Sequence, residues 1–294
     1  MNKCRLCEIP DGVSKLENLE IFSCSYNELT ELSIVICKIG TLAVLDISHN
    51  LLSRLPEDIG RLTALTSLNC SHNTLVNLPK SVGRLLQLTD LDLSSNTIVQ
   101  VVSKVSRLTQ LAVLNLSENL LEALPPEIGK LKNLRSLQLG SNAYREYSTE
   151  LCSLRHLEFL DVSNSRLDRL PGAFTNLKSL NELWMKGTHI KVKPSLLQFM
   201  TTLKSLVLDP DCMDYGVVDQ IFQKEQKSQR TLTVWEKHRL DVVTIQNAAA
   251  DPLFKEKKVW AQDTPNLLEL MGYGAARRES KRVSGKRLAR SRYH

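Results

Sequence analysis

Residues 42–62 read LAVLDISHNLLSRLPEDIGRL, and this spacing of apolar residues returns every 23 residues along most of the chain. The opening leucine recurs without insertion or deletion at Leu19, Leu42, Leu65, Leu88, Leu111, Leu134, Leu157, Leu180 and Leu203. A strict period of this length is typical of stacked supersecondary units that cannot bury their apolar faces alone. The sequence therefore predicts a solenoid whose function is carried by an extended surface.

The repeat can be written L-x-x-L-x-L-x-x-N-x-L-x-x-L-P-x-x-I-x-x-L. This pattern resembles the leucine-rich repeat, in the 23-residue subtype of intracellular Ras-pathway scaffolds and their plant, Ras-group-related, relatives. The resemblance runs from about residue 9 to residue 210. It implies an α/β fold: a leucine-rich repeat solenoid, or curved horseshoe, with a parallel sheet on its concave face and a C-terminal extension.

The alternation within x-L-x-L predicts a short strand with one buried face in each turn. The buried column contains Phe22, Leu45, Leu68, Leu91, Leu114, Leu137, Leu160, Leu183 and Leu206. A second column follows the strands and contains Asn27, Asn50, Asn73, Asn96, Asn119 and Asn142. Buried amides can satisfy backbone groups that a bend leaves unpaired, so we interpret these asparagines as structural.

Two features predict irregular turns. The asparagine position is taken by Ser165, Thr188 and Asp211 in the last turns, and Lys193 stands where a leucine is expected. Prolines begin the convex segments at Pro56, Pro79, Pro125, Pro171 and Pro194, whereas Val102 and Ser148 interrupt this series. We therefore expect the two convex segments without proline to differ from the others.

Departures from the period suggest four regions. They are an N-terminal cap (1–18), the solenoid (19–210), a C-terminal capping region (211–260), and a short helix with a basic tail (261–294). Residues 217–225 have a helical pattern that fits a cover for the last turn. Thr264, Pro265 and Gly272 delimit a second short helix.

The chain has no apolar run approaching the ~20 residues of a membrane span, and residues 1–7 lack a signal-peptide core. We expect an intracellular, cytoplasmic protein, with a cytoskeletal or ciliary location as one alternative. Cys24 and Cys70 occupy core positions, while Cys37 and Cys152 are five repeats apart and too distant to pair.

Metal binding, cofactors and catalysis are not expected. Cys4 and Cys7 form a lone C-x-x-C, half of a zinc site without a second half, and His49 and His72 stack on adjacent turns without a third ligand. No phosphate-binding loop or nucleophile–base pair is recognisable, so we expect no enzyme activity.

The excess positive charge is concentrated at the C-terminus. Residues 272–294 contain one acid, Glu279, and eight basic residues: Arg277, Arg278, Lys281, Arg282, Lys286, Arg287, Arg290 and Arg292. This composition is typical of a segment that cannot fold alone and that often has no specific partner. Its possible functions are a nuclear-import address, contact with an acidic surface such as tubulin and, as the weaker alternative, RNA binding. Ser280 and Ser284 fit basophilic kinase sites.

The outward strand positions indicate where a partner would bind. Most are small or polar, but the neighbouring later turns carry an apolar group flanked by charges: Phe159, Asp161, Glu182, Trp184, Lys186 and Val207. Aromatic residues of this kind dominate interface energetics. We interpret the group as a protein-binding site; the alternative that residues 211–260 fold over it stays open.

Three functions remain. The first is a non-catalytic scaffold that binds a protein on its concave face and is tethered by its tail. The second is a structural subunit, monomeric within a large assembly such as the ciliary or axonemal microtubule cytoskeleton. The third is a ribonucleoprotein subunit. Loss of a partner on removal of residues 272–294 would favour an assembly subunit over a scaffold.

Overall fold

The computed structural model of the chain describes residues 1–146, 149–190, 202–209, 230–234 and 243–247. The predicted helix at 217–225, Lys193, Ser148, the short helix after Thr264 and the basic tail lie outside these residues. The boundaries of the four predicted regions stay predictions.

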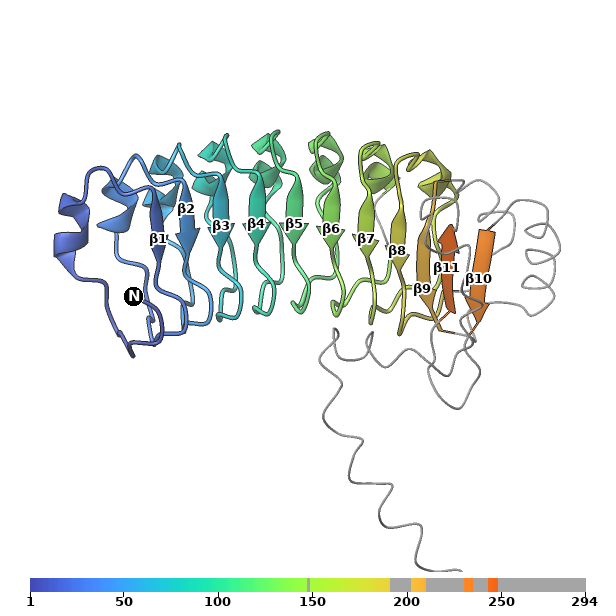
Figure 1. Ribbon diagram of the computed structural model, residues 1–294, viewed down its shortest axis with the longest axis horizontal. Coiled ribbons are helices and arrows are strands. Elements are labelled where there is room, and N and C mark those ends of the chain that lie inside the picture. The colour runs from blue at the N-terminus through green and yellow to red at the C-terminus, as the bar shows by residue number, and fades with distance from the viewer. Residues whose placement is uncertain (147–148, 191–201, 210–229, 235–242, 248–294) are drawn as a thin grey trace, which may run out of the picture. The chain divides into compact units, whose positions relative to one another are not determined.

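Nine short parallel strands form one open, curved sheet on the concave face, one strand for each turn (Figure 1). They are β1 (Ile21–Ser23), β2 (Val44–Asp46), β3 (Ser67–Asn69), β4 (Asp90–Asp92), β5 (Val113–Asn115), β6 (Ser136–Gln138), β7 (Phe159–Asp161), β8 (Glu182–Trp184) and β9 (Ser205–Leu208). Each residue pairs with the one 23 positions later, as Leu45 does with Leu68. The period of the sequence is therefore the register of the sheet.

A short 3₁₀-helix, η1, precedes β1, and the chain returns from each of the strands β1 to β7 through another. These are η1 (Asp11–Lys15), η2 (Ile36–Lys38), η3 (Glu57–Arg61), η4 (Lys80–Arg84), η5 (Ser103–Arg107), η6 (Pro126–Lys130), η7 (Thr149–Ser153) and η8 (Gly172–Asn176). The repeat prolines precede these helices in an extended conformation, as at Pro79 with φ −67° and ψ 147°. A proline is suited to that position because its φ is already fixed near the required value.

The expectation that the segment after Val102 would differ is wrong. Val102 has φ −66° and ψ 135°, and the helix that follows, η5, is as long as η4. Valine favours this extended region of the backbone without a ring to enforce it, so losing the proline does not change the turn.

A single hydrophobic core lies behind the strands. The predicted column from Leu45 to Leu206 is at most 1% exposed, and Phe22 at its start is 5% exposed. Cys24 and Cys70 are fully buried in the same core, as the repeat predicts. Near the N-terminus Ile9 and Val13 join it.

The asparagine column bonds neighbouring turns to each other. In Asn50 the side-chain Oδ1 accepts from the backbone N–H of Leu29, 3.0 Å away, while Nδ2 donates to the carbonyl oxygens of Cys24 and Ile47 at 3.1 Å. The structural interpretation is confirmed. In the later turns Ser165 and Thr188 keep one of these bonds, because their hydroxyls donate to the carbonyl three residues earlier, at 2.7 and 2.8 Å.

The sheet does not end at β9. Beyond it lie β11 (Val243–Asn247) and then β10 (Arg230–Val234), both antiparallel to their neighbours. Val207 of β9 pairs with Trp184 on one side and with Thr244 on the other. β11 thus extends the sheet sideways, as Figure 1 shows.

Candidate binding site on the concave face

The concave face carries the outward first and third residues of each strand. Through β6 these positions hold mainly small, β-branched or polar residues, with aspartate and asparagine frequent at the third position. The third-position side chains stabilise the turn after the strand. Oδ1 of Asp46 accepts from the backbone N–H of Ser48 at 3.1 Å, and Oδ1 of Asp92 accepts from that of Ser94 at 2.9 Å. Their frequency therefore follows from the fold and does not by itself indicate a ligand.

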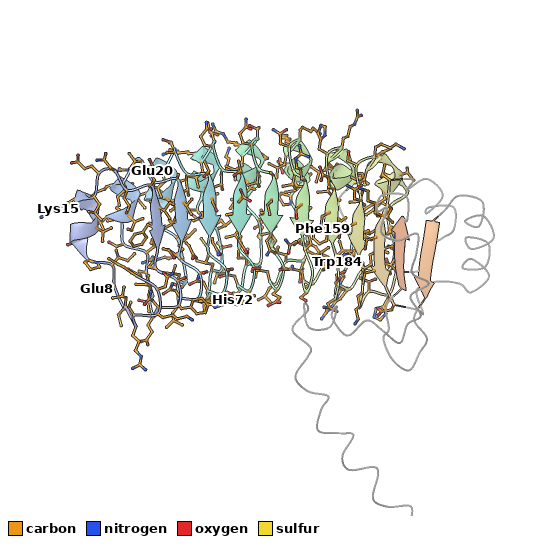
Figure 2. All side chains as sticks on the ribbon, viewed as in Figure 1. Glu8, Lys15, Glu20, His72, Phe159 and Trp184 are labelled. Carbon is orange, nitrogen blue, oxygen red and sulfur yellow. The ribbon has the colours of Figure 1, made fainter. Side chains whose placement is uncertain are left out.

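Phe159 and Trp184 break this pattern and contact each other (Figure 2). Phe159 begins β7 and Trp184 ends β8, so they are diagonal neighbours in the sheet. Their ring centroids lie 5.1 Å apart and their planes meet at 88°, the favourable edge-to-face arrangement. Both side chains are half-buried, which leaves part of the aromatic pair accessible.

The indole N–H of Trp184 is unusual. Its Nε1 atom is buried and has no hydrogen-bond partner in the part of the chain that the structure describes. A buried donor without an acceptor destabilises the fold by about 1–3 kcal/mol. A binding partner that provides an acceptor would explain the indole N–H of Trp184, which is unpaired among the described residues.

The other predicted site residues surround the pair. Oδ1 of Asp161 accepts from the backbone N–H of Ser163 at 2.8 Å, so this carboxylate stabilises its turn as its counterparts in earlier turns do. Glu182 and Lys186 are exposed, and Val207 is half-buried on the adjoining strand. The predicted site residues thus lie on the neighbouring strands β7, β8 and β9 or, in the case of Lys186, just after β8. Their role in binding stays a prediction.

A second column marks the corner after each strand. Tyr26, His49 and His72 occupy this corner in a left-handed conformation, with φ between 52° and 57°. Tyr26 stacks on His49 with 3.9 Å between ring centroids, and His49 stacks on His72 at 4.0 Å. The sequence predicts the contact between the two histidines; Tyr26 was missed, although it stands 23 residues before His49.

The candidate metal ligands and nucleophiles can also be placed. Within the described ranges, no group of three or more histidine, cysteine, aspartate or glutamate side chains is positioned to hold a metal ion. Cys4 and Cys7 are exposed free thiols. Burial raises the pKa of the Cys37 and Cys152 thiols to about 11, so neither is a thiolate nucleophile at neutral pH.

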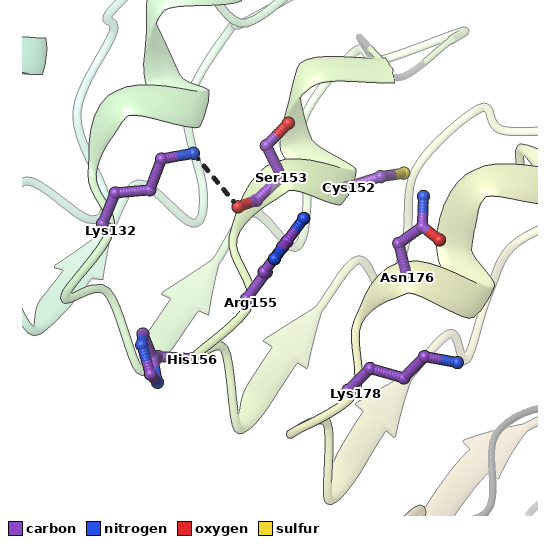
Figure 3. Close-up of a pocket in the computed structure, with 7 residues that line it drawn as sticks. All are labelled: Lys132, Cys152, Ser153, Arg155, His156, Asn176 and Lys178. Atoms are coloured by element: carbon purple, nitrogen blue, oxygen red, sulfur yellow. Dashed lines mark hydrogen bonds between the residues drawn. The ribbon is translucent and has the colours of Figure 1, made fainter.

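A basic depression lies near the ends of η6, η7 and η8 (Figure 3). Its volume is about 750 Å³, and its lining consists of Lys132, Cys152, Ser153, Arg155, His156, Asn176 and Lys178. This feature was missed from the sequence. The signal was present, because three of these basic residues are spaced 23 positions apart.

Comparison with known proteins places the chain in a family. A model described as "Leucine-rich repeat region" matches residues 100–271, more than half of the chain, and one described as "Leucine Rich Repeat" matches residues 41–62. The chain belongs to the leucine-rich repeat family. No curated protein sequence matches this leucine-rich repeat protein. Among its described residues, no helix is long and apolar enough to cross a membrane.

Several solved structures are similar to this leucine-rich repeat protein. The ectodomain of the plant membrane receptor kinase GASSHO1/SCHENGEN3 from Arabidopsis thaliana is 25% identical, with a TM-score of 0.58, over 70% of this chain and 28% of its own. The plant peptide hormone receptor RGFR1 is 25% identical, with a TM-score of 0.57, over 68% and 38%. InlJ from Listeria monocytogenes, 24% identical with a TM-score of 0.53 over 70% and 47%, shows the fold alone. The chain spans less than half the length of each.

Proposed function

We propose that this leucine-rich repeat protein is a non-catalytic scaffold that binds a protein partner on its concave face, around Phe159 and Trp184. The observation that carries the proposal is the accessible edge-to-face pair whose indole N–H lacks an acceptor among the described residues. An extended partner segment would cover the rings and bring a carbonyl oxygen to the indole after a small rotation. Leucine-rich repeat proteins generally mediate protein–protein interaction, and two similar structures, GASSHO1/SCHENGEN3 and RGFR1, are complexes with CASPARIAN STRIP INTEGRITY FACTOR 2 and RGF2.

The charged residues around the pair would select the partner. Glu182 and Lys186 are exposed on either side of Trp184 along the chain, so a partner segment with a basic and an acidic residue flanking an apolar centre would fit. Rim charges of this kind affect association rate and specificity more than affinity.

Proximity labelling in cells tests this function. The full chain is compared with Phe159→Ala/Trp184→Ala and with Val113→Ala, a control that removes an outward apolar side chain at the strand position of Phe159 two turns earlier. We expect the aromatic variant to lose the main labelled proteins and the control to keep them. Unchanged labelling by the aromatic variant would exclude this part of the concave face.

Trp184→Phe separates the ring from its N–H. It keeps most of the apolar surface and removes the donor, so a partner that accepts a hydrogen bond from the indole should bind this variant more weakly than the wild type. Equal binding would mean that the partner reads the apolar surface alone.

The basic tail supports a second candidate, a subunit held in a large assembly by contact with an acidic surface such as tubulin. Its support is the charge distribution, since residues 272–294 carry a net +7 against +6 for the whole chain. Removing residues 272–294 discriminates the two functions. A scaffold keeps its labelled neighbours, whereas an assembly subunit loses them; salt-sensitive RNA binding without tubulin binding would favour a ribonucleoprotein.

A further inference from the structure

Three cationic side chains stand one above another at the edge of neighbouring turns. Lys132, Arg155 and Lys178 lie two residues after the ends of η6, η7 and η8 respectively. Their backbone N–H groups make the same bond, to the carbonyl oxygen of the last helical residue, at 2.9, 3.0 and 2.9 Å. The identical backbone geometry projects the three side chains from consecutive turns toward the same side.

The fold itself does not require cations at this position. The equivalent residues of earlier turns are Thr63, Leu86 and Thr109, and they make the same backbone bond at 2.8, 2.9 and 2.9 Å. Threonine and leucine therefore serve the turn as well as lysine or arginine. Within this series of six turns, the positive charges are confined to the three that line the basic depression.

The three charges have no ion-pair partner among the described residues, where none of them takes part in a salt bridge. Among the described residues, the lining of the depression contains no carboxylate. Like charges on neighbouring turns repel each other, so the unliganded arrangement is electrostatically unfavourable. A bound anion would remove that repulsion.

The surrounding groups add hydrogen-bond donors. Figure 3 shows Arg155 pointing up between Ser153 and Asn176, with His156 at the lower edge. Lys132 reaches across to donate to the Ser153 carbonyl oxygen at 3.3 Å, which uses one of its three donors. The guanidinium fork, two ammonium groups and an amide make a donor-rich wall suited to the oxygens of phosphate groups.

The lining also limits the ligand. The lining residues that the structure describes include no aromatic ring other than the imidazole of His156 and no aliphatic side chain, so they offer little surface for stacking a nucleobase or burying an acyl chain. A volume of about 750 Å³ is within the usual range for small-molecule sites. Because burial raises the pKa of the Cys152 thiol to about 11, this group stays protonated and takes no part in covalent chemistry.

We propose that Lys132, Arg155 and Lys178 form a binding site for a small molecule that carries two or more phosphate groups. The site shares no described residue with the aromatic pair and does not depend on its function. Such a ligand neutralises several cations at once, and its phosphates are spaced over neighbouring turns about 5 Å apart.

Calorimetric titration of the full chain tests the proposal. The probes are pyrophosphate and inositol hexakisphosphate, at ~150 mM salt to suppress weak surface binding. The test variant is Lys132→Thr/Arg155→Thr/Lys178→Thr, because threonine already occupies this position at Thr63 and Thr109. We expect binding at least roughly tenfold weaker than for the wild type, since charge-assisted bonds are lost at three residues.

The basic tail makes a charge-matched control necessary. Arg84→Gln/Lys104→Gln/Arg107→Gln removes the same number of charges from η4 and η5, where these residues have no salt bridge among the described residues. The control should bind the probes as the wild type does. Equal weakening of both variants, or no binding by the wild type, overturns the proposal. Thermal unfolding shows whether each variant is folded.

A phosphorylated peptide is the third probe in the calorimetric titration. If a phosphopeptide binds through the three residues while both small probes fail to bind, the small-molecule proposal is wrong and the site reads a phosphorylated protein instead. If the small probes bind and the phosphopeptide does not, the proposal stands.

Discussion

Asn73 connects its own turn to the one before it: its Oδ1 accepts a hydrogen bond from the backbone N–H of Leu52 at 3.0 Å, and its Nδ2 donates to the carbonyl oxygen of Ile47 at 3.0 Å. Both partners belong to the preceding turn and are buried. Without Asn73 the buried Leu52 N–H would have no acceptor among the described residues, whereas the Ile47 carbonyl oxygen also accepts from Nδ2 of Asn50 at 3.1 Å. The amide thus holds neighbouring turns together.

Replacing Asn73 with alanine should destabilise the solenoid by about 1–3 kcal/mol, because it leaves the buried Leu52 N–H without an acceptor. Asn73→Ser should cost less, since a hydroxyl keeps the local bond seen at Ser165. Urea unfolding measures the change, with exposed Gln110→Ala as the control. A serine variant as unstable as the alanine variant would contradict this account.

The helices η4 and η5 approach each other so closely at Gly83 that we expect only glycine to fit there. A Cβ atom at Gly83 would lie 2.6 Å from the backbone carbonyl oxygen of Lys104 in the next turn, too close for contact. Gly83→Ala should therefore lower the free energy of unfolding by about 1–3 kcal/mol. Gly172→Ala is the matched control, because a Cβ atom there meets nothing within 4 Å. Denaturant midpoints of the two variants should differ clearly.

The stacked histidines predict a pH dependence of stability. Burial and then the charge of His72 lower the pKa of His49, while Asp46 opposes them. Because the folded pKa lies below the unfolded value of 6.5, protonation favours the unfolded chain. The contribution of His49 is thus present above pH 6.5 and is lost as the pH falls through the folded pKa.

Melting temperatures at about pH 7.5 and about pH 5.5 check this expectation. The wild type should lose more thermal stability on acidification than His72→Gln, in which the neighbouring charge cannot form. Carboxylates titrate in both proteins, so the difference between the proteins isolates the histidine pair. An equal loss in both would show that the stack does not couple their protonation.

The buried thiols should resist alkylation. Burial raises the pKa of Cys24 to about 12 and that of Cys37 and Cys152 to about 11, whereas Cys4 and Cys7 are exposed. Iodoacetamide at neutral pH should label the peptide with Cys4 and Cys7 in the native protein. Mass spectrometry should find the other three labelled only after denaturation. Native labelling of Cys24 would mean that the first turns open readily.

Much of the fold could be predicted because the period assigns each residue an environment. Cys24 takes the core position that Ile47 takes one turn later, and the structure buries both completely. The same reasoning failed at Val102, where a missing proline suggested a different segment. Backbone conformation there follows from the turns packed on either side, so the local residue type is not decisive.

The candidate site was harder to predict. Period-2 alternation predicts that Phe159 and Trp184 face outward, but their edge-to-face contact depends on side-chain rotamers across a diagonal of the sheet. The indole N–H without a partner among the described residues likewise arises from packing that no spacing reveals. Lys132, Arg155 and Lys178 could have been found, since comparing one repeat position along the chain reveals them.

The switch from parallel to antiparallel pairing at β9 and β11 has a consequence for self-association. Parallel strands related by a constant shift would let a second molecule add to the end of the sheet in the same register, and further molecules could continue a fibre. β11 is antiparallel to β9, so the parallel 23-residue register ends at β9. The strand β1 of a second molecule therefore cannot pair with the edge of β9, because β11 already occupies it. β11 and, beyond it, β10 thus cover the side of β9 on which a further repeat would pair.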